Sequence, residues 1–163
     1  MADLWAKIYY AFAYQIIQTL GEEKGKQLLV DCIRRYAAIR GTSVADFVAR
    51  QGLDLNAENF VRFYDAPFSD VQRACLSLFP DCKLESAEGT TFCPYKEIWE
   101  QFSNGTEIGR IYCEAFHEAM WKSYHPRLRV KQDKIMTRGD EMCTFLTFMD
   151  GEEDKSVLIF DQK

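Results

Sequence analysis

The sequence predicts an α+β fold, in which N-terminal helices are followed by a four- to five-strand antiparallel sheet with two packed helices. Apolar residues recur at helical spacing through residues 1–66, whereas short β-like runs separated by turn residues follow Asp70. The chain contains no repeat, low-complexity tract or linker. We therefore expect a single α+β domain over residues 1–163, with a helical part at 1–66 and the sheet and its helices at 70–163.

Four helices are predicted in the first part, each from an amphipathic pattern bounded by capping or breaking residues. Asp3 and Asn56 are suited to helix N-termini, and Gly21 and Gly41 are expected to end the first two helices. The helices are expected at residues 3–20, 22–40, 43–52 and 56–64.

The second part alternates between strands and helices. Pro94 suits the first turn of a helix, and Asn104 with Gly105 separates that helix from a longer one capped by Thr106. The two helices are expected at residues 94–102 and 106–125. The strands are expected at residues 71–76, 82–92, 128–135, 142–148 and 157–160.

Charge and hydropathy limit the classes of partner. The net charge is −5, with 20 basic and 25 acidic residues, so the concentrated basic face that nucleic acid requires is absent. The densest basic cluster, Arg34, Arg35 and Arg40, is predicted to be a solvated helix face. No apolar stretch has the length of a membrane span and no leader precedes the first helix, which predicts a cytoplasmic protein. We expect a small-molecule substrate or ligand, and neither nucleic acid nor membrane.

Six cysteines are expected to be free thiols, because a chain without a leader is predicted to stay in a reducing compartment. They stand at positions 32, 75, 82, 93, 113 and 143. No two have C-x-x-C spacing, so a zinc ribbon or redox motif has no local support. We assign no metal and no cofactor.

The helix after Thr106 carries the clearest chemical pattern. Cys113 and His117 lie one turn apart on its aromatic face, where an imidazole could take the proton of a thiol nucleophile. The same pair could supply two metal ligands, or be a small buried cysteine and a core histidine. Glu114 and Glu118 fall on another, charged face of this helix, which is expected to be solvated.

Five further residues are candidates for a substrate site. Cys93 precedes a helix, whose N-terminal dipole should lower its pKa, and Cys143 begins a strand. Asp140 lies in a Gly-Asp turn, and Tyr112 and Tyr124 could form the walls of a cavity. Each of these residues is also explained by packing or turn formation.

Four short motifs lie along the second half of the chain: Phe92-Cys93-Pro94, Gly109-x-x-Tyr112-Cys113, Tyr124-His125-Pro126 and Gly139-Asp140-Glu141-Met142-Cys143-Thr144-Phe145. Taken together, they resemble the L-2-amino-thiazoline-4-carboxylic acid hydrolase family, and the likeness covers most of the chain. The resemblance implies hydrolysis of a C–N bond in a small cyclic amidine, opening an aminothiazoline-carboxylate ring to give N-carbamoyl-cysteine.

The resemblance also bears on the site residues. Cys93, Cys113 and Cys143 match positions where the family tends to carry cysteine, whereas His117 stands where many relatives carry an acidic residue. Glu114 and Glu118 lie close to that position in the sequence. With the helix pattern, this makes Cys113, His117 and Glu114 the expected catalytic residues. The expected substrate-binding residues are Cys93, Tyr112, Tyr124, Asp140 and Cys143.

Two other functions remain open from the sequence. Helices followed by a small antiparallel sheet are also similar to hydrocarbon-binding and haem nitric-oxide-binding modules, in which His117 would be the axial ligand. The second is a scaffold without pocket chemistry. If the chain is a hydrolase, metal-assisted attack by water is an alternative to a cysteine nucleophile.

Overall fold

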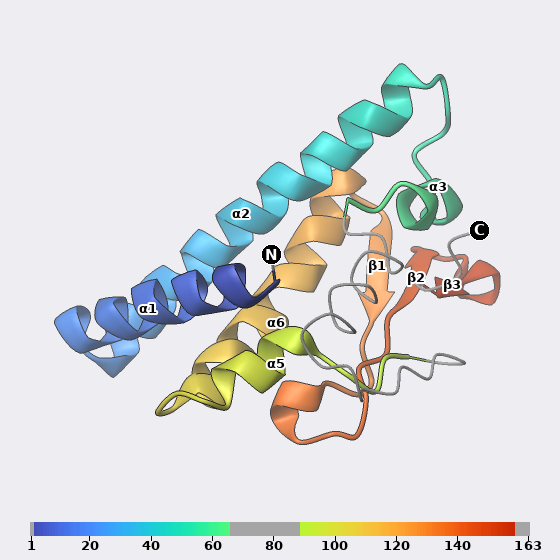
Figure 1. Cartoon of the computed structure of the whole chain (residues 1–163). Helices are drawn as coiled ribbons and strands as arrows, with labels where there is room; N and C mark the ends of the chain where they lie inside the picture. The colour runs from blue at the N-terminus through green and yellow to red at the C-terminus, as the bar shows by residue number, and fades with distance from the viewer. Residues whose placement is uncertain (1, 66–88, 159–163) are drawn as a thin grey trace.

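The structure, a computed structural model, describes residues 2–65 and 89–158 and has the expected mixed α+β architecture (Figure 1). Within these residues the sheet has three antiparallel strands in the order β1-β2-β3. The helices are α1 (Ala2–Leu20), α2 (Glu22–Arg50), α3 (Ala57–Arg62), α5 (Pro94–Trp99) and α6 (Gly105–Tyr124), with short 3₁₀ turns at Met136–Arg138 and Glu153–Lys155. The strands are β1 (Leu128–Lys131), β2 (Leu146–Met149) and β3 (Val157–Leu158).

The predicted helix break at Gly41 is wrong, because α2 continues through it to Arg50. A Cβ atom on Gly41 would lie 2.2 Å from the carbonyl oxygen of Met120 in α6, so this glycine serves the close approach of two helices rather than a turn. The separate helix expected at 43–52 is therefore part of α2, and Ser43 donates its hydroxyl to the Ile39 carbonyl one turn earlier (2.8 Å). The predicted break at Gly21, which has φ 79°, is confirmed.

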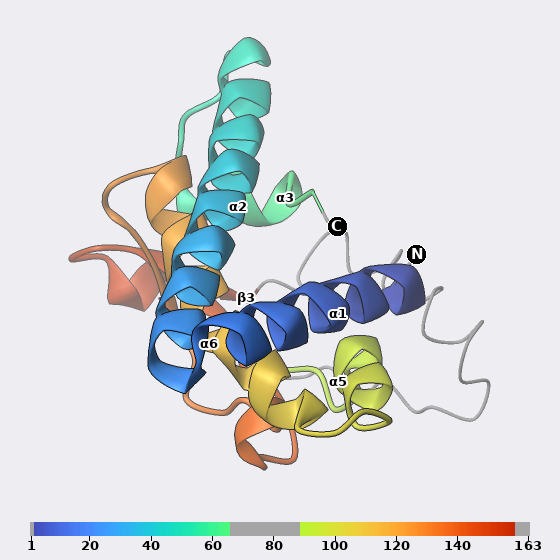
Figure 2. The same ribbon diagram turned by 90° about the vertical axis from the view of Figure 1, so that its left-hand side faces the viewer.

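Helix α6 packs along α2, while α1 diverges from α2 and lies over α5 (Figure 2). Two tryptophans fix this arrangement. Trp99 of α5 donates its indole N–H to the Ala6 carbonyl of α1 (3.0 Å), and Trp121 of α6 donates to the Thr147 hydroxyl of β2 (3.0 Å). Both indoles are fully buried, so the hydrogen bonds satisfy donors that have lost their water. The core therefore links the helices to the sheet through α6.

The expected sheet of four to five strands is larger than the sheet seen in the described residues. The predicted strand at 71–76 and most of that at 82–92 lie outside them, and Thr90 makes only an isolated bridge with Cys143. Strand β1 ends at Lys131 instead of 135, because the Thr144 hydroxyl accepts the N–H groups of Asp133 and Lys134 (both 3.1 Å) and turns the chain. No strand occurs within residues 2–65, as predicted.

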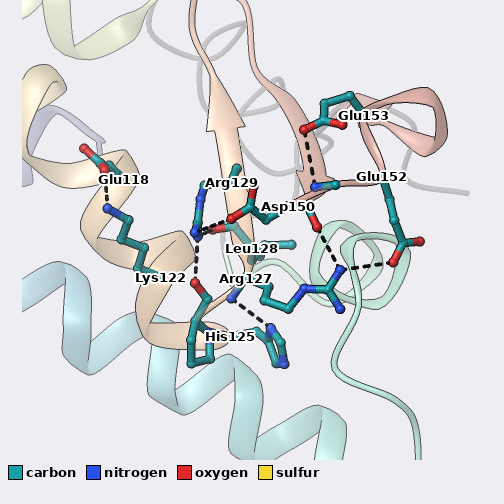
Figure 3. Close-up of polar contacts among 11 residues, drawn as sticks. Glu118, Lys122, His125, Arg127, Leu128, Arg129, Asp150, Glu152 and Glu153 are labelled. Atoms are coloured by element: carbon teal, nitrogen blue, oxygen red, sulfur yellow. Dashed lines mark hydrogen bonds and ion pairs between the residues drawn. The ribbon is translucent and has the colours of Figure 1, made fainter.

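A group of surface polar contacts holds the turn between α6 and β1 against the end of β2 (Figure 3). Arg127 donates to the carbonyl of Asp150 (2.7 Å), and Arg129 pairs with the Asp150 carboxylate (2.8 Å). His125 Nδ1 accepts the Arg127 backbone N–H (3.1 Å). His125 therefore has a turn-forming role, and His117 is the histidine to consider for chemistry.

The four cysteines in the described residues, Cys32, Cys93, Cys113 and Cys143, are free thiols, as predicted. Cys75 and Cys82 lie outside the described residues. No helix in the described part of the chain has the length and apolar character needed to cross a membrane.

Candidate functional site

A cavity of about 200 Å³ lies between α2, α5, α6 and the segment from Gln132 to Phe145. Its walls are mostly aromatic, and three thiols, an imidazole and a guanidinium are the main reactive or charged groups that reach it. The lining residues in the described chain are Trp5, Tyr36, Arg40, Tyr64, Thr90, Phe92, Cys93, Pro94, Tyr95, Trp99, Tyr112, Cys113, Phe116, His117, Gln132, Ile135, Cys143 and Phe145. A concave, largely apolar site with a few polar groups is typical of small-molecule binding.

Cys113 and His117 both line the cavity, because their spacing of four residues puts them on one face of α6. His117 Nδ1 lies 2.9 Å from the Cys113 carbonyl oxygen, so Nδ1 carries the proton and donates it. The lone pair is then on Nε2. Burial, with the nearby Arg40 charge, lowers the pKa of His117 to about 4, so the ring is neutral near pH 7.

The three cavity thiols are protonated near neutral pH. Burial raises the pKa of Cys113 to about 12, and it also raises the pKa of Cys143. Cys143 Sγ accepts the Met136 backbone N–H at 3.2 Å. These thiols therefore need a base or a bound ligand before they can act as nucleophiles.

The expected lowering of the Cys93 pKa by a helix N-terminus is wrong. Burial raises it strongly, and the backbone N–H groups of Lys96 and Tyr95, which favour the thiolate, only partly offset that. Helix α5 has six residues, so its dipole is small. Desolvation in the aromatic cavity is the larger effect.

Five of the eight expected site residues line the cavity, and three do not. Glu114 lies on the outer face of α6 and pairs with Arg138 at 2.9 Å. Tyr124 packs in the core against Phe60, with ring centroids 4.9 Å apart. Asp140 is a turn residue whose carboxylate accepts the Ile135 N–H (2.7 Å). The residues that do line the cavity are Cys93, Tyr112, Cys113, His117 and Cys143.

Arg40 also lines the cavity, although the sequence predicted that it would be on a solvated face. Its side chain is 17% exposed, and its guanidinium lies 4.9 Å from the centre of the Phe116 ring. Nε donates to Asp65 Oδ2 (2.7 Å) and Nη2 to Oδ1, a bidentate pair that keeps the charge inside. The helical period could have found it, because Arg40 is three residues after Ala37 and four before Val44, both buried.

Gln132 is a second residue that the sequence analysis missed. It follows β1 and lines the cavity, and its Nε2 atom is buried without a hydrogen-bond partner among the described residues. No pattern in the sequence distinguishes it from other polar residues near a strand end. An unpaired buried amide is a donor available to a ligand.

The cavity residues do not make an evident metal site. Within residues 2–65 and 89–158, no three or more His, Cys, Asp or Glu side chains are grouped so that they could hold a metal ion.

The chain matches the family described as L-2-amino-thiazoline-4-carboxylic acid hydrolase over residues 1–146, a range that includes the described residues that line the cavity. Neither the curated proteins nor the solved structures provide a match.

Proposed function

This chain belongs to the L-2-amino-thiazoline-4-carboxylic acid hydrolase family, and from that premise we propose that it opens a small cyclic amidine ring of the aminothiazoline-carboxylate type by hydrolysis. The observation that carries the proposal is the thiol and imidazole of Cys113 and His117 at one aromatic cavity. At about 200 Å³, the cavity is smaller than the roughly 300–1,000 Å³ typical of sites for drug-sized ligands. A single five-membered ring with short substituents suits that size.

In the proposed reaction, Cys113 Sγ attacks the amidine carbon and His117 Nε2 receives the thiol proton. His117 is available for this because its Nδ1–H is held by the Cys113 carbonyl and its ring is neutral near pH 7. A thiol with a pKa of about 12 and an imidazole with a pKa of about 4 exchange a proton unfavourably at rest. Proton transfer therefore accompanies formation of the carbon–sulfur bond, and the basic amidine nitrogen can share the proton.

The atom balance of ring opening identifies the bond that breaks. N-carbamoyl-cysteine keeps both nitrogens on the former amidine carbon and carries a free thiol, so the bond lost is the one from that carbon to the ring sulfur. This differs from the C–N bond expected above. The ring sulfur leaves with the proton that Cys113 gave up and becomes the free thiol of the product, while the carbon stays attached to Cys113. One water then replaces Cys113: its oxygen becomes the carbonyl oxygen, one of its protons goes to the former amidine nitrogen, and the other restores the Cys113 thiol.

The remaining expected residues have smaller or no roles in this proposal. Tyr112 supplies an aromatic wall, and Cys93 and Cys143 are neutral thiols that border the same space. Glu114, Tyr124 and Asp140 do not line the cavity, so none is assigned a part in the reaction.

The proposal is tested by incubating the purified full chain with 2-amino-thiazoline-4-carboxylate and following the product by mass spectrometry. Turnover is expected for the wild type and for Cys32→Ser, a matched control at an exposed thiol, whereas Cys113→Ser should lose at least about 100-fold with its thermal midpoint almost unchanged. Retained turnover in a folded Cys113→Ser variant rejects the nucleophile. Binding by the wild type without turnover supports the ligand-binding alternative instead.

A further inference from the structure

We infer that Arg40 and Gln132 form an anion subsite that holds the carboxylate of the ligand, and that this subsite makes the cavity selective for acids over neutral analogues. The identity of the acid rests on the proposed function above. The selectivity itself is a binding property and does not require turnover.

Among the described residues that line the cavity, Arg40 is the one side chain that carries a charge near neutral pH. His117 is neutral, the three thiols are protonated, and the pKa of Tyr112 is raised well above its usual value. A ligand anion entering this aromatic space would therefore meet a single full positive charge. Charge-assisted bonds of a guanidinium to a carboxylate are among the strongest hydrogen bonds in proteins.

The guanidinium is held in place before any ligand arrives. The rings of Tyr36 and Tyr64 each lie 5.6 Å from its carbon, in addition to the Phe116 ring on the α6 side. Asp65 occupies two of its five N–H donors. Donors remain for a second anion, and because Arg40 is already ordered, a ligand loses little entropy in ordering it.

Gln132 gives an independent indication of a ligand oxygen at this cavity. Its buried Nε2 makes no hydrogen bond within the described part of the chain. A carboxylate has two acceptor oxygens and no donor, so it can accept from the guanidinium and from this amide. The primary amide of a carboxamide analogue carries N–H donors and no charge, and it matches the two donors less well.

The simpler alternative is that Arg40 and Asp65 only tie α2 to the chain after α3. The two interpretations predict different binding. A purely structural pair, when broken, should weaken the binding of every ligand alike, whereas an anion subsite should weaken the binding of acids selectively.

The test measures the affinities of 2-amino-thiazoline-4-carboxylate and of its 4-carboxamide by calorimetry, with turnover blocked by Cys113→Ser. Arg40→Gln should weaken acid binding about 10- to 100-fold and change carboxamide binding less than about twofold. Gln132→Leu should weaken acid binding less than Arg40→Gln does. Gln132→Glu should weaken it more than Gln132→Leu, because the new carboxylate has the same charge as the acid. Arg35→Gln, exposed on the same helix, is the matched control and should change neither affinity.

Because Arg40→Gln leaves Asp65 without its partner, the double variant Arg40→Gln with Asp65→Asn is the second form if the single variant does not fold. Equal weakening of acid and carboxamide, or wild-type protein that binds both alike, overturns the subsite. Selective binding of the acid with no turnover by the unmodified chain rejects the proposed function but supports the subsite. Turnover by Arg40→Gln with an unchanged KM supports the proposed function but rejects the subsite.

Discussion

Replacing Gly41 with alanine tests the close approach of α2 and α6. The added methyl group would lie 2.2 Å from the carbonyl oxygen of Met120, 3.0 Å from Ser123 Cβ and 3.1 Å from the backbone nitrogen of Tyr124. Two of these three atoms belong to the backbone, so a side-chain rotation cannot relieve the clash. The helices must separate by more than about 1 Å to restore ordinary contact distances.

The expected cost follows from two opposing effects. Overpacking a core typically destabilises a protein by about 1–3 kcal/mol, and a clash with backbone belongs at the upper end of that range. Replacing a helical glycine with alanine returns roughly 1 kcal/mol through helix propensity. The net loss is therefore about 2 kcal/mol, equivalent to a thermal midpoint lower by about 4–8 °C for a chain of this size.

Urea unfolding followed by circular dichroism at pH 7 measures this loss. Thr42→Ala is the matched control, because Thr42 is the next residue of α2 and is exposed, so it gains helix propensity without a clash. The control should be unchanged or slightly more stable. A Gly41→Ala protein as stable as the control would refute the tight helix contact.

Three further predictions concern the buried polar groups. The pKa of His117 is lowered from about 6.5 to about 4, so on acidification the unfolded chain binds a proton before the folded chain does. The free energy of unfolding should therefore fall between pH 6.5 and pH 4, by up to about 3 kcal/mol. Urea unfolding of His117→Gln at pH 5 and pH 7 should show a smaller difference than the wild type, and equal differences would contradict the pKa. Iodoacetamide at pH 7.5 should label the exposed Cys32 well before Cys113, as read by peptide mass spectrometry, and the reverse order would contradict a protonated cavity thiol. Trp121→Phe should cost about 1–3 kcal/mol by leaving the Thr147 hydroxyl unpaired, and a double-mutant cycle with Thr147→Val that shows no coupling would count against that hydrogen bond.

The sequence predicted local structure well where local chemistry determines it. The helix ending at Gly21 and the helix beginning at Pro94 are set by backbone preferences of nearby residues, and both are present. The pairing of Cys113 with His117 on one face follows from helical geometry alone. These features do not depend on which other segment packs against them.

The errors occur where a distant segment decides. The sequence predicts a helix end at Gly41, but glycine is needed there because the α6 backbone, about 80 residues away along the chain, comes too close for a side chain. The sequence places Arg40 beside Arg34 and Arg35 on a polar face, yet the Phe116 ring and Asp65 hold its guanidinium inside the cavity. The helix position of Cys93 predicts a lowered pKa, whereas desolvation by the surrounding cavity raises it. Long-range packing and burial are not visible in a local pattern.

The glycine contact between α2 and α6 also governs how the cavity can respond to its ligands. Arg40 adjoins Gly41 on α2, and Cys113 and His117 lie on α6, so the charged group and the reactive pair stand on two helices whose backbones are in direct contact. That half of the cavity cannot change shape by sliding one helix over the other, since close-packed backbones leave no room. Adaptation to a different ligand is therefore left to the other lining segments, from Thr90 to Trp99 and from Gln132 to Phe145. We expect ligand range to change through substitutions in those segments, while the two helices keep Arg40, Cys113 and His117 in fixed positions.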